Sequence, residues 1–279
     1  MLARGLRVTI LLLVAGGCAA AWLAGQRAPL AILAFGVLAP VVVVLALVAL
    51  SYAIAQVNPM RGGAGEALAS VTKFLGTMVA PSDAPSGDGT PVLLVHGYGC
   101  NRGAFNRLAP RLAVAGLQPH FHDLEPVYAS IDDYVPALAA RIDEVLRSTG
   151  VPRITVVCHS MGGLALRAYV ARHGAGKLAG VVTIGTPHAG TVLAILGLGT
   201  NGRQMRPGSA WLADLERARA DALSVPWLAI WSTHDNIVAP ADSARMAGAD
   251  ELRLEGIGHL AMLDSPAVAE AIARRVSSL

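Results

Sequence analysis

The sequence predicts an α/β domain on a mostly parallel, doubly wound sheet, preceded by a transmembrane hairpin of two hydrophobic helices. Three observations lead to this prediction. Residues 1–60 contain three arginines and no acidic residue. From residue 91 onward, short apolar runs alternate with helix-like segments, as in parallel sheets covered on both faces. Reactive side chains follow several of the predicted strands, where sites of such sheets lie.

The composition of the 279-residue chain excludes several classes of function. Hydrophobic residues make up 54% of it and charged residues 15%, against ~25% charged in an average soluble domain. Because three of the 22 basic residues lie in residues 1–60, those that follow equal the 19 acidic residues in number. A neutral remainder argues against nucleic-acid binding, which needs a basic patch. Three scattered cysteines predict neither a disulfide framework nor a zinc site.

Two uncharged runs, residues 8–25 and 30–57, predict a membrane anchor over residues 1–60. A spanning helix needs about 20 apolar residues, so we expect residues 8–57 to bind the lipid bilayer. A buried core helix is one alternative. Another is a signal peptide over residues 1–25, because two arginines precede the first apolar run.

The basic residues around these runs predict a topology. Arg4 and Arg7 precede the first run, Arg61 and Lys73 follow the second, and Arg27 lies between them. Basic residues beside membrane helices tend to stay cytoplasmic. We therefore expect the globular part at the cytoplasmic face of the membrane. Richness in alanine, arginine and glycine suggests a bacterial source, and hence the inner membrane.

The rest of the chain divides into a linker and a catalytic domain. Residues 61–90 are expected to form a linker with an amphipathic helix at 64–79. In the domain, residues 91–279, apolar runs predict strands at 92–96, 118–124, 153–158, 178–184, 227–232 and 251–254. Helices are expected at 103–116, 130–148, 161–173 and 267–276. Ser130 and Asp133 form a capping-box variant at the start of the second of these helices.

Ser160 stands where the third predicted strand turns into a helix, and this context predicts a nucleophile elbow. The turn needs small residues two positions before and after the serine. Gly162 meets this requirement, whereas Cys158 replaces the first glycine of the G-x-S-x-G pattern. A serine in such a turn can also be no more than a helix N-cap.

Two later strand ends supply candidate partners for this serine. Asp235 follows the strand at 227–232, and His259 follows the strand at 251–254. The order Ser160, Asp235, His259 is that of a hydrolase triad. Serine is a poor nucleophile at neutral pH, so a histidine must accept its proton and an acid must orient that histidine.

Other acids and bases compete for these roles. Asp264 is a rival acid, although its place before Pro266 favours a helix start. The rival bases are His96, His159, His188 and His234. We expect His96 and His159, at strand ends, to be structural, hydrogen-bonded neighbours. His120 and His122 have a possible metal-ligand spacing, but no third ligand cluster accompanies them, so we expect no metal and no cofactor.

The glycine-bordered loop at 96–99 predicts an oxyanion hole. The backbone N–H groups of Tyr98 and Met161 are the expected donors, so the side chain of Tyr98 should matter less. Further along, residues 191–199 form an apolar stretch. We interpret Val192, Leu193 and Leu196 as an acyl-binding wall or short lid, with one buried helix as the alternative.

Five segments together resemble the bacterial triacylglycerol lipases and esterases of the α/β-hydrolase superfamily, namely 96–99, 158–163, 185–191, 235–238 and 258–260. The resemblance covers residues 91–279 and implies the α/β-hydrolase fold. It implies Ser160 as nucleophile, His259 as general base and Asp235 as its orienting acid. Tyr98 and Met161 would supply the oxyanion N–H groups. The anchor lies outside the lipase pattern.

These observations predict a membrane-anchored serine hydrolase that cleaves carboxylic esters, of lipids or of other apolar acyl groups, through an acyl-enzyme. A thioesterase, amidase or acyltransferase with the same triad is the alternative. A protein without enzymatic activity, such as a membrane scaffold, is a second alternative. The complete set of triad and oxyanion residues argues against it. The sequence identifies no protein partner.

Overall fold

The computed structural model describes residues 89–218 and 223–279. The expected membrane hairpin and the amphipathic helix at 64–79 lie outside the described residues. Within residues 89–218 and 223–279, no helix has the length and apolar character needed to cross a membrane.

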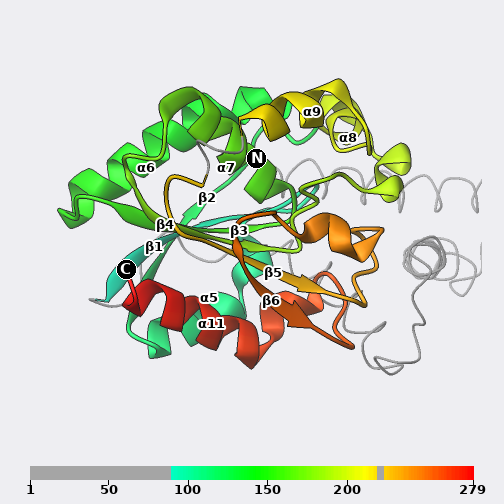
Figure 1. Cartoon of the computed structure of the whole chain (residues 1–279). Helices are drawn as coiled ribbons and strands as arrows, with labels where there is room; N and C mark the ends of the chain where they lie inside the picture. Colours follow the sequence, from blue (N-terminus) through cyan, green and yellow to red (C-terminus); the bar gives the residue numbers. More distant parts are fainter. Residues whose placement is uncertain (1–88, 219–222) are drawn as a thin grey trace, which may run out of the picture.

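A six-stranded parallel sheet forms the centre of the described structure (Figure 1). Its strands are β1 (Thr90–Val95), β2 (Leu117–His122), β3 (Ile154–His159), β4 (Leu178–Ile184), β5 (Trp227–Ser232) and β6 (Asp250–Leu254). Their order in the sheet is β2-β1-β3-β4-β5-β6. The direction of winding therefore reverses between β1 and β3, and ligands of open α/β sheets bind at the carboxyl ends of strands at such a point.

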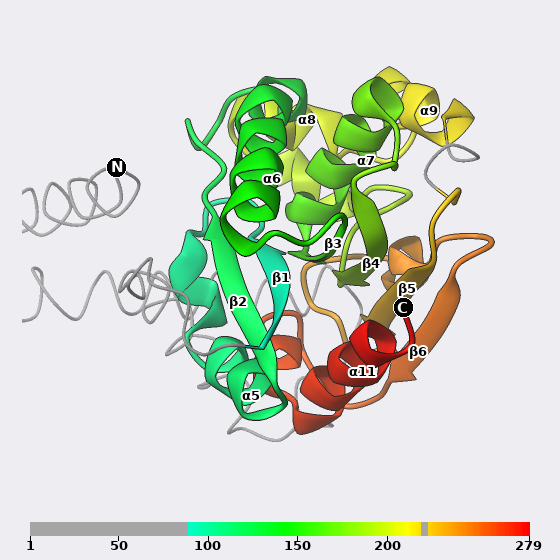
Figure 2. The same cartoon turned by 90° about the vertical axis from the view of Figure 1, so that its left-hand side faces the viewer.

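Helices cover both faces of the sheet, as expected for parallel strands. On one face lie α6 (Val135–Thr149) and α7 (Met161–His173), together with α8 (Gly199–Gln204) and α9 (Ala210–Arg217) (Figure 1). On the other face lie α5 (Leu108–Val114) and α11 (Pro266–Ser277) (Figure 2).

The strands divide the core into two apolar layers. In β3, Val156 and Cys158 pack in the layer beneath α6 and α7, whereas Val157 packs in the layer beneath α5 and α11. This alternation follows from the two-residue period of a strand. Because both faces are buried, β3 is apolar along most of its length, and its carboxyl end is buried as well.

Local sequence signals explain where several helices begin. Ser130 and Asp133 form the expected capping box, in which the Ser130 N–H donates to the Asp133 carboxylate at 3.0 Å, but it begins a 3-10 turn at Ile131–Tyr134 that leads into α6 and not α6 itself. The expectation of one helix over 103–116 is wrong, because a 3-10 turn at Arg102–Phe105 precedes α5. Pro110 explains the break, since a proline is tolerated only in the first turn of a helix, and α5 starts two residues before it. Helices α8 and α9 were not predicted.

Candidate active site

Ser160 lies between the last residue of β3 and the first residue of α7. Its φ is 55° and its ψ is −129°, and among the described residues it is the one non-glycine residue with a positive φ. Such a conformation costs on the order of 1–3 kcal/mol and persists only where neighbours enforce it. Here the Thr186 hydroxyl donates to the Ser160 carbonyl at 2.8 Å, and the Ser160 N–H donates to Ile184 at 2.9 Å.

The glycines after Ser160 allow α7 to approach the sheet closely. A Cβ atom on Gly162 would lie 2.6 Å from the carbonyl oxygens of Val95 and His96, and one on Gly163 would lie 2.2 Å from the Thr186 hydroxyl. Cys158, at the position of the other motif glycine, has room because its side chain packs in the core layer beneath α7. The motif therefore requires glycine at position 162, after Ser160, whereas position 158, before Ser160, accepts cysteine.

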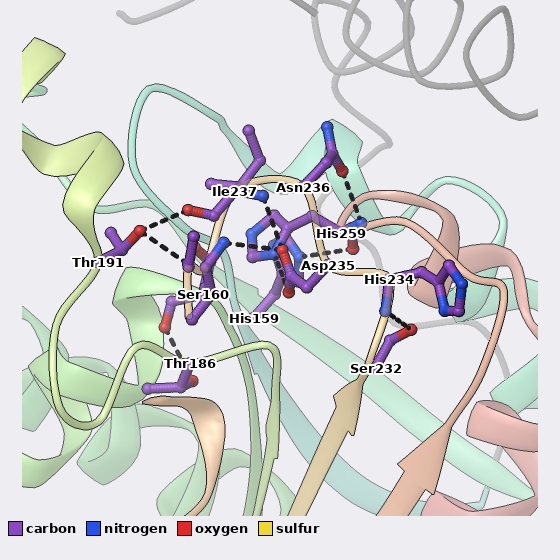
Figure 3. A network of polar contacts seen from close by, with 12 residues as sticks. His159, Ser160, Thr186, Thr191, Ser232, His234, Asp235, Asn236, Ile237 and His259 are labelled. Atoms are coloured by element: carbon purple, nitrogen blue, oxygen red, sulfur yellow. Dashed lines mark hydrogen bonds and ion pairs between the residues drawn. The ribbon is translucent and has the colours of Figure 1, made fainter. Parts of the chain in front are cut away.

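The loops after β5 and β6 bring Asp235 and His259 together (Figure 3). The buried Asp235 carboxylate lies 2.8 Å from His259 Nδ1 through Oδ2, and its Oδ1 accepts the N–H groups of Ile237 and Val238, each at 2.8 Å. The backbone N–H of His259 donates to the Asn236 side-chain oxygen at 3.1 Å. The carboxylate is thus held by its own loop and presents one oxygen to the imidazole, which places a proton on Nδ1.

His159 connects this pair to Ser160. Its ring centroid lies 4.6 Å from that of His259, and its Nε2 lies 3.4 Å from the His259 carbonyl oxygen. Burial, together with the nearby His259, holds the pKa of His159 well below its usual value, so the ring is neutral near pH 7. His159 is therefore a buried, hydrogen-bonded neighbour of the site.

The rival acids and bases have other partners. Asp264 forms an ion pair with Arg107 at 3.8 Å and directly precedes the N-cap of α11. His188 is buried, with its Nε2 3.2 Å from the Thr183 hydroxyl, and burial holds its pKa well below the usual value. His234 accepts the Gly256 N–H at 2.9 Å through Nδ1. These contacts tie Asp264, His188 and His234 to structural neighbours.

The loop after β1 packs against Ser160. A Cβ atom on Gly97 would lie 2.6 Å from the Ser160 Cβ, so only glycine permits this approach. His96 accepts the Leu124 N–H at Nε2, which leaves the proton on Nδ1 to be donated to the Gly97 carbonyl at 2.8 Å. In a trans peptide the N–H points away from the preceding carbonyl. The same hydrogen bond therefore fixes the direction of the Tyr98 N–H.

The N–H groups of Tyr98 and Met161 take part in no hydrogen bond among residues 89–218 and 223–279. Met161 opens α7, and the first N–H groups of a helix have no partner within it. The side chain of Tyr98 has a role that sequence reasoning missed. Its hydroxyl accepts the Leu198 N–H at 2.7 Å and donates to the Leu198 carbonyl at 3.0 Å.

The apolar stretch after β4 is a short 3-10 helix, η4 (Val192–Leu196), followed by Gly197 and Leu198. The alternative of one buried helix is wrong, because only Ala194 of η4 is buried. Among the described residues, four of the seven exposed large apolar side chains lie in this stretch, namely Val192, Ile195, Leu196 and Leu198. Leu193 is half-buried.

The two histidines of β2, His120 and His122, have the spacing of a possible metal-ligand pair. In the part of the chain that the structure describes, no three His, Cys, Asp or Glu side chains gather in a way that could hold a metal ion. His120 lies 3.3 Å from the Gln118 side chain, and burial lowers the pKa of His122 to about 4.

Comparisons with known proteins agree with this architecture. Residues 90–200 match the family model described as the α/β-hydrolase fold. A non-heme chloroperoxidase, CPO-A1, of Kitasatospora aureofaciens is 32% identical over 104 residues, which cover 35% of this chain and 37% of that protein. A triacylglycerol lipase of Pseudarthrobacter phenanthrenivorans is 44% identical over 57 residues, or 20% of this chain and 18% of the lipase. The chain thus spans well under half of the length of these curated relatives.

Solved structures extend the likeness to a larger share of the chain. The crystal structure of the Bacillus licheniformis lipase BlEst2 in mature form superposes with a TM-score of 0.60 at 19% identity, covering 70% of this chain and 95% of that one. At this identity the likeness concerns the fold. The described structure therefore has the α/β-hydrolase fold, and its sequence relatives include a lipase and a chloroperoxidase.

Proposed function

We propose that this chain is a serine hydrolase that cleaves carboxylic esters of apolar acyl groups, with Ser160 as nucleophile, His259 as general base and Asp235 as the acid that orients the base. One observation carries the proposal. Ser160 is held in a strained conformation at the winding reversal of the sheet, and its neighbour His159 contacts the imidazole that is paired with Asp235 at 2.8 Å.

The proposed reaction passes through an acyl-enzyme. Ser160 Oγ bonds to the acyl carbon while its proton passes to His259 Nε2, and the carbonyl electron pair moves onto the oxygen. The N–H groups of Tyr98 and Met161 stabilise this oxyanion. The alcohol then leaves with the proton from His259. Water attacks the acyl-enzyme, gives a proton to His259, and releases the carboxylic acid as Ser160 regains its proton.

The apolar segment after β4 would contact the acyl chain through Val192, Leu193 and Leu196. The exposure of most of these side chains supports this role, because acyl sites are mostly apolar with few polar groups. Replacing the exposed Leu196 with serine should shift the preferred chain length of the ester with little change in melting temperature. An unchanged preference would contradict this part of the proposal.

The test of the reaction uses p-nitrophenyl esters of two to sixteen carbons on the wild type and Ser160→Ala, with a fluorophosphonate probe. We expect ester hydrolysis and labelling at Ser160 in the wild type and neither in the variant. Labelling without hydrolysis, together with turnover of a thioester, an amide or an acyl acceptor, would favour a thioesterase, amidase or acyltransferase. Absence of labelling would contradict the serine mechanism and favour a non-catalytic role.

We further propose that residues 8–57 anchor this hydrolase in a bacterial inner membrane, with the catalytic part on the cytoplasmic side. The support is the absence of charge within the two apolar runs and the excess of basic residues outside them. Alkaline phosphatase fused after Leu279 should be inactive, and a fluorescent protein fused there should fluoresce. An active phosphatase fusion would place the catalytic part on the other side.

A further inference from the structure

We infer that the hydroxyl groups of Tyr98 and Thr191 are positioning groups that set the acyl-chain preference of the site, because they fix the two ends of the apolar segment 192–198. The inference rests on the proposed function, since it concerns the part of the ester that this segment would contact. It also gives the Tyr98 side chain a role of its own, because the proposed oxyanion hole would use only the backbone N–H of Tyr98.

Tyr98 holds the far end of the segment. Its hydroxyl both accepts from the Leu198 N–H, at 2.7 Å, and donates to the Leu198 carbonyl, at 3.0 Å. Two hydrogen bonds to one residue fix both the position and the rotation of that part of the backbone. Tyr98 follows Gly97, which packs against Ser160. The far end of the segment is therefore tied to the loop expected to bind the oxyanion.

Thr191 holds the near end of the segment, and its side chain is buried. The Thr191 hydroxyl donates to the Ile237 carbonyl at 2.7 Å and accepts the Ala239 N–H at 3.0 Å (Figure 3). The next residue, Val192, donates its N–H to the Ala239 carbonyl at 2.9 Å. Ile237 also donates its N–H to the Asp235 carboxylate. The near end is therefore tied to the loop that carries the proposed catalytic acid.

The segment thus joins the two loops that carry the proposed oxyanion donor and the proposed acid. Residues 192–198 contain no polar side chain, and four of their apolar side chains are exposed. In the part of the chain that the structure describes, the hydroxyls of Tyr98 and Thr191 are the side-chain groups that hydrogen-bond the two ends of this apolar surface to the loops of the site. If either hydroxyl is lost, the segment can shift, and a long acyl chain loses contacts that a two-carbon acyl group never makes.

The experiment measures kcat/KM for p-nitrophenyl dodecanoate and acetate on Tyr98→Phe and Thr191→Val. We expect the dodecanoate-to-acetate ratio to fall by at least about fivefold in each, because each variant loses two hydrogen bonds and the loss of one alone represents about that factor. Thr191→Ser keeps the hydroxyl and should retain the wild-type ratio. Tyr128→Phe is the matched control, because the Tyr128 ring lies 5.7 Å from that of Tyr98. The Tyr128 hydroxyl has no hydrogen bond among the described residues.

Hydrogen exchange of peptides covering residues 192–199 provides a readout that is independent of activity. Exchange should be faster in Tyr98→Phe than in the wild type and in Tyr128→Phe. An unchanged dodecanoate-to-acetate ratio, or unchanged exchange in Tyr98→Phe, overturns the inference. If the wild type hydrolyses no ester, the proposed function fails and the assignment of chain preference fails with it. The exchange data then still decide whether the Tyr98 hydroxyl holds the segment.

Discussion

The substitution Asp235→Asn tests the proposed acid most directly, because the structure determines which way the new amide must face. Oδ1 of Asp235 accepts the N–H groups of Ile237 and Val238, each at 2.8 Å. In the variant only the amide oxygen can accept these two hydrogen bonds, so the NH₂ group must face His259 Nδ1. The reverse orientation would lose both bonds, at about 1 kcal/mol each, which is about a thirtyfold bias.

An NH₂ group facing Nδ1 forces that nitrogen to be the acceptor and moves the proton to Nε2, where it blocks transfer from Ser160. We expect kcat to fall by about 10⁴-fold, the effect of trapping this tautomer in a serine triad, while the nearly isosteric side chain leaves the fold intact. The assay is hydrolysis of p-nitrophenyl butyrate, with circular dichroism and thermal melting as checks of folding.

Asp264→Asn serves as the matched control, because Asp264 pairs with Arg107. It should retain activity within a few-fold of the wild type. An active Asp235→Asn together with an inactive Asp264→Asn would refute the assignment of the acid.

Further predictions concern the nucleophile, the elbow and the pH dependence of stability. Ser160→Ala combined with His259→Ala should be no slower than either single variant, because the residues of a triad act as a unit; additive losses of kcat would contradict this. Gly162→Ala should destabilise by about 1–3 kcal/mol through overpacking, since the added methyl group would lie 2.6 Å from two backbone carbonyl oxygens. Gly176→Ala, which meets nothing, is the control in thermal melts. Urea unfolding at pH 7 and pH 5 should show a loss of stability on acidification. Burial lowers the pKa of His122 to about 4 and holds those of His159 and His188 well below the usual value, so at these three histidines only the unfolded chain binds protons as the pH falls below ~6.5. His122→Gln should reduce this loss, and an equal loss would point to other groups.

The sequence predicted the regular elements of the described part well where the apolar pattern was unambiguous. The strand at 178–184 and the helix at 161–173 agree with β4 and α7 at both ends. The prediction of one helix over 103–116 was wrong because it followed the helical spacing of the apolar residues. Pro110 limits how far before it a helix can begin. Helix α8 is only six residues long. Helix α9 has local signals that were missed, because Ser209 accepts the Leu212 N–H as its N-cap and the buried Leu212 and Leu215 lie on one face.

The candidate residues of the site could be predicted from their residue types and from their positions at the ends of predicted strands. The structure brings His259 to Asp235, as the chain order suggested, and the assignment of catalytic roles remains a prediction. The sequence could not show whether the apolar stretch after β4 is buried or exposed, because a buried core helix and an exposed acyl-binding wall are both built from apolar residues. The hydrogen bonds of the Tyr98 hydroxyl join residues far apart in the chain, and no local signal predicts such contacts.

The strand order has a consequence for the biosynthesis of this protein. The loop after β1 and the turn at Ser160 come from the first half of the described chain, whereas Asp235 and His259 follow the two strands added last at one edge of the sheet. A nascent chain therefore exposes the nucleophile before the acid and base have been synthesised. Under the proposed function, a nascent chain that ends before His259 is inert toward acyl esters, and activity begins only when β6 has paired with β5.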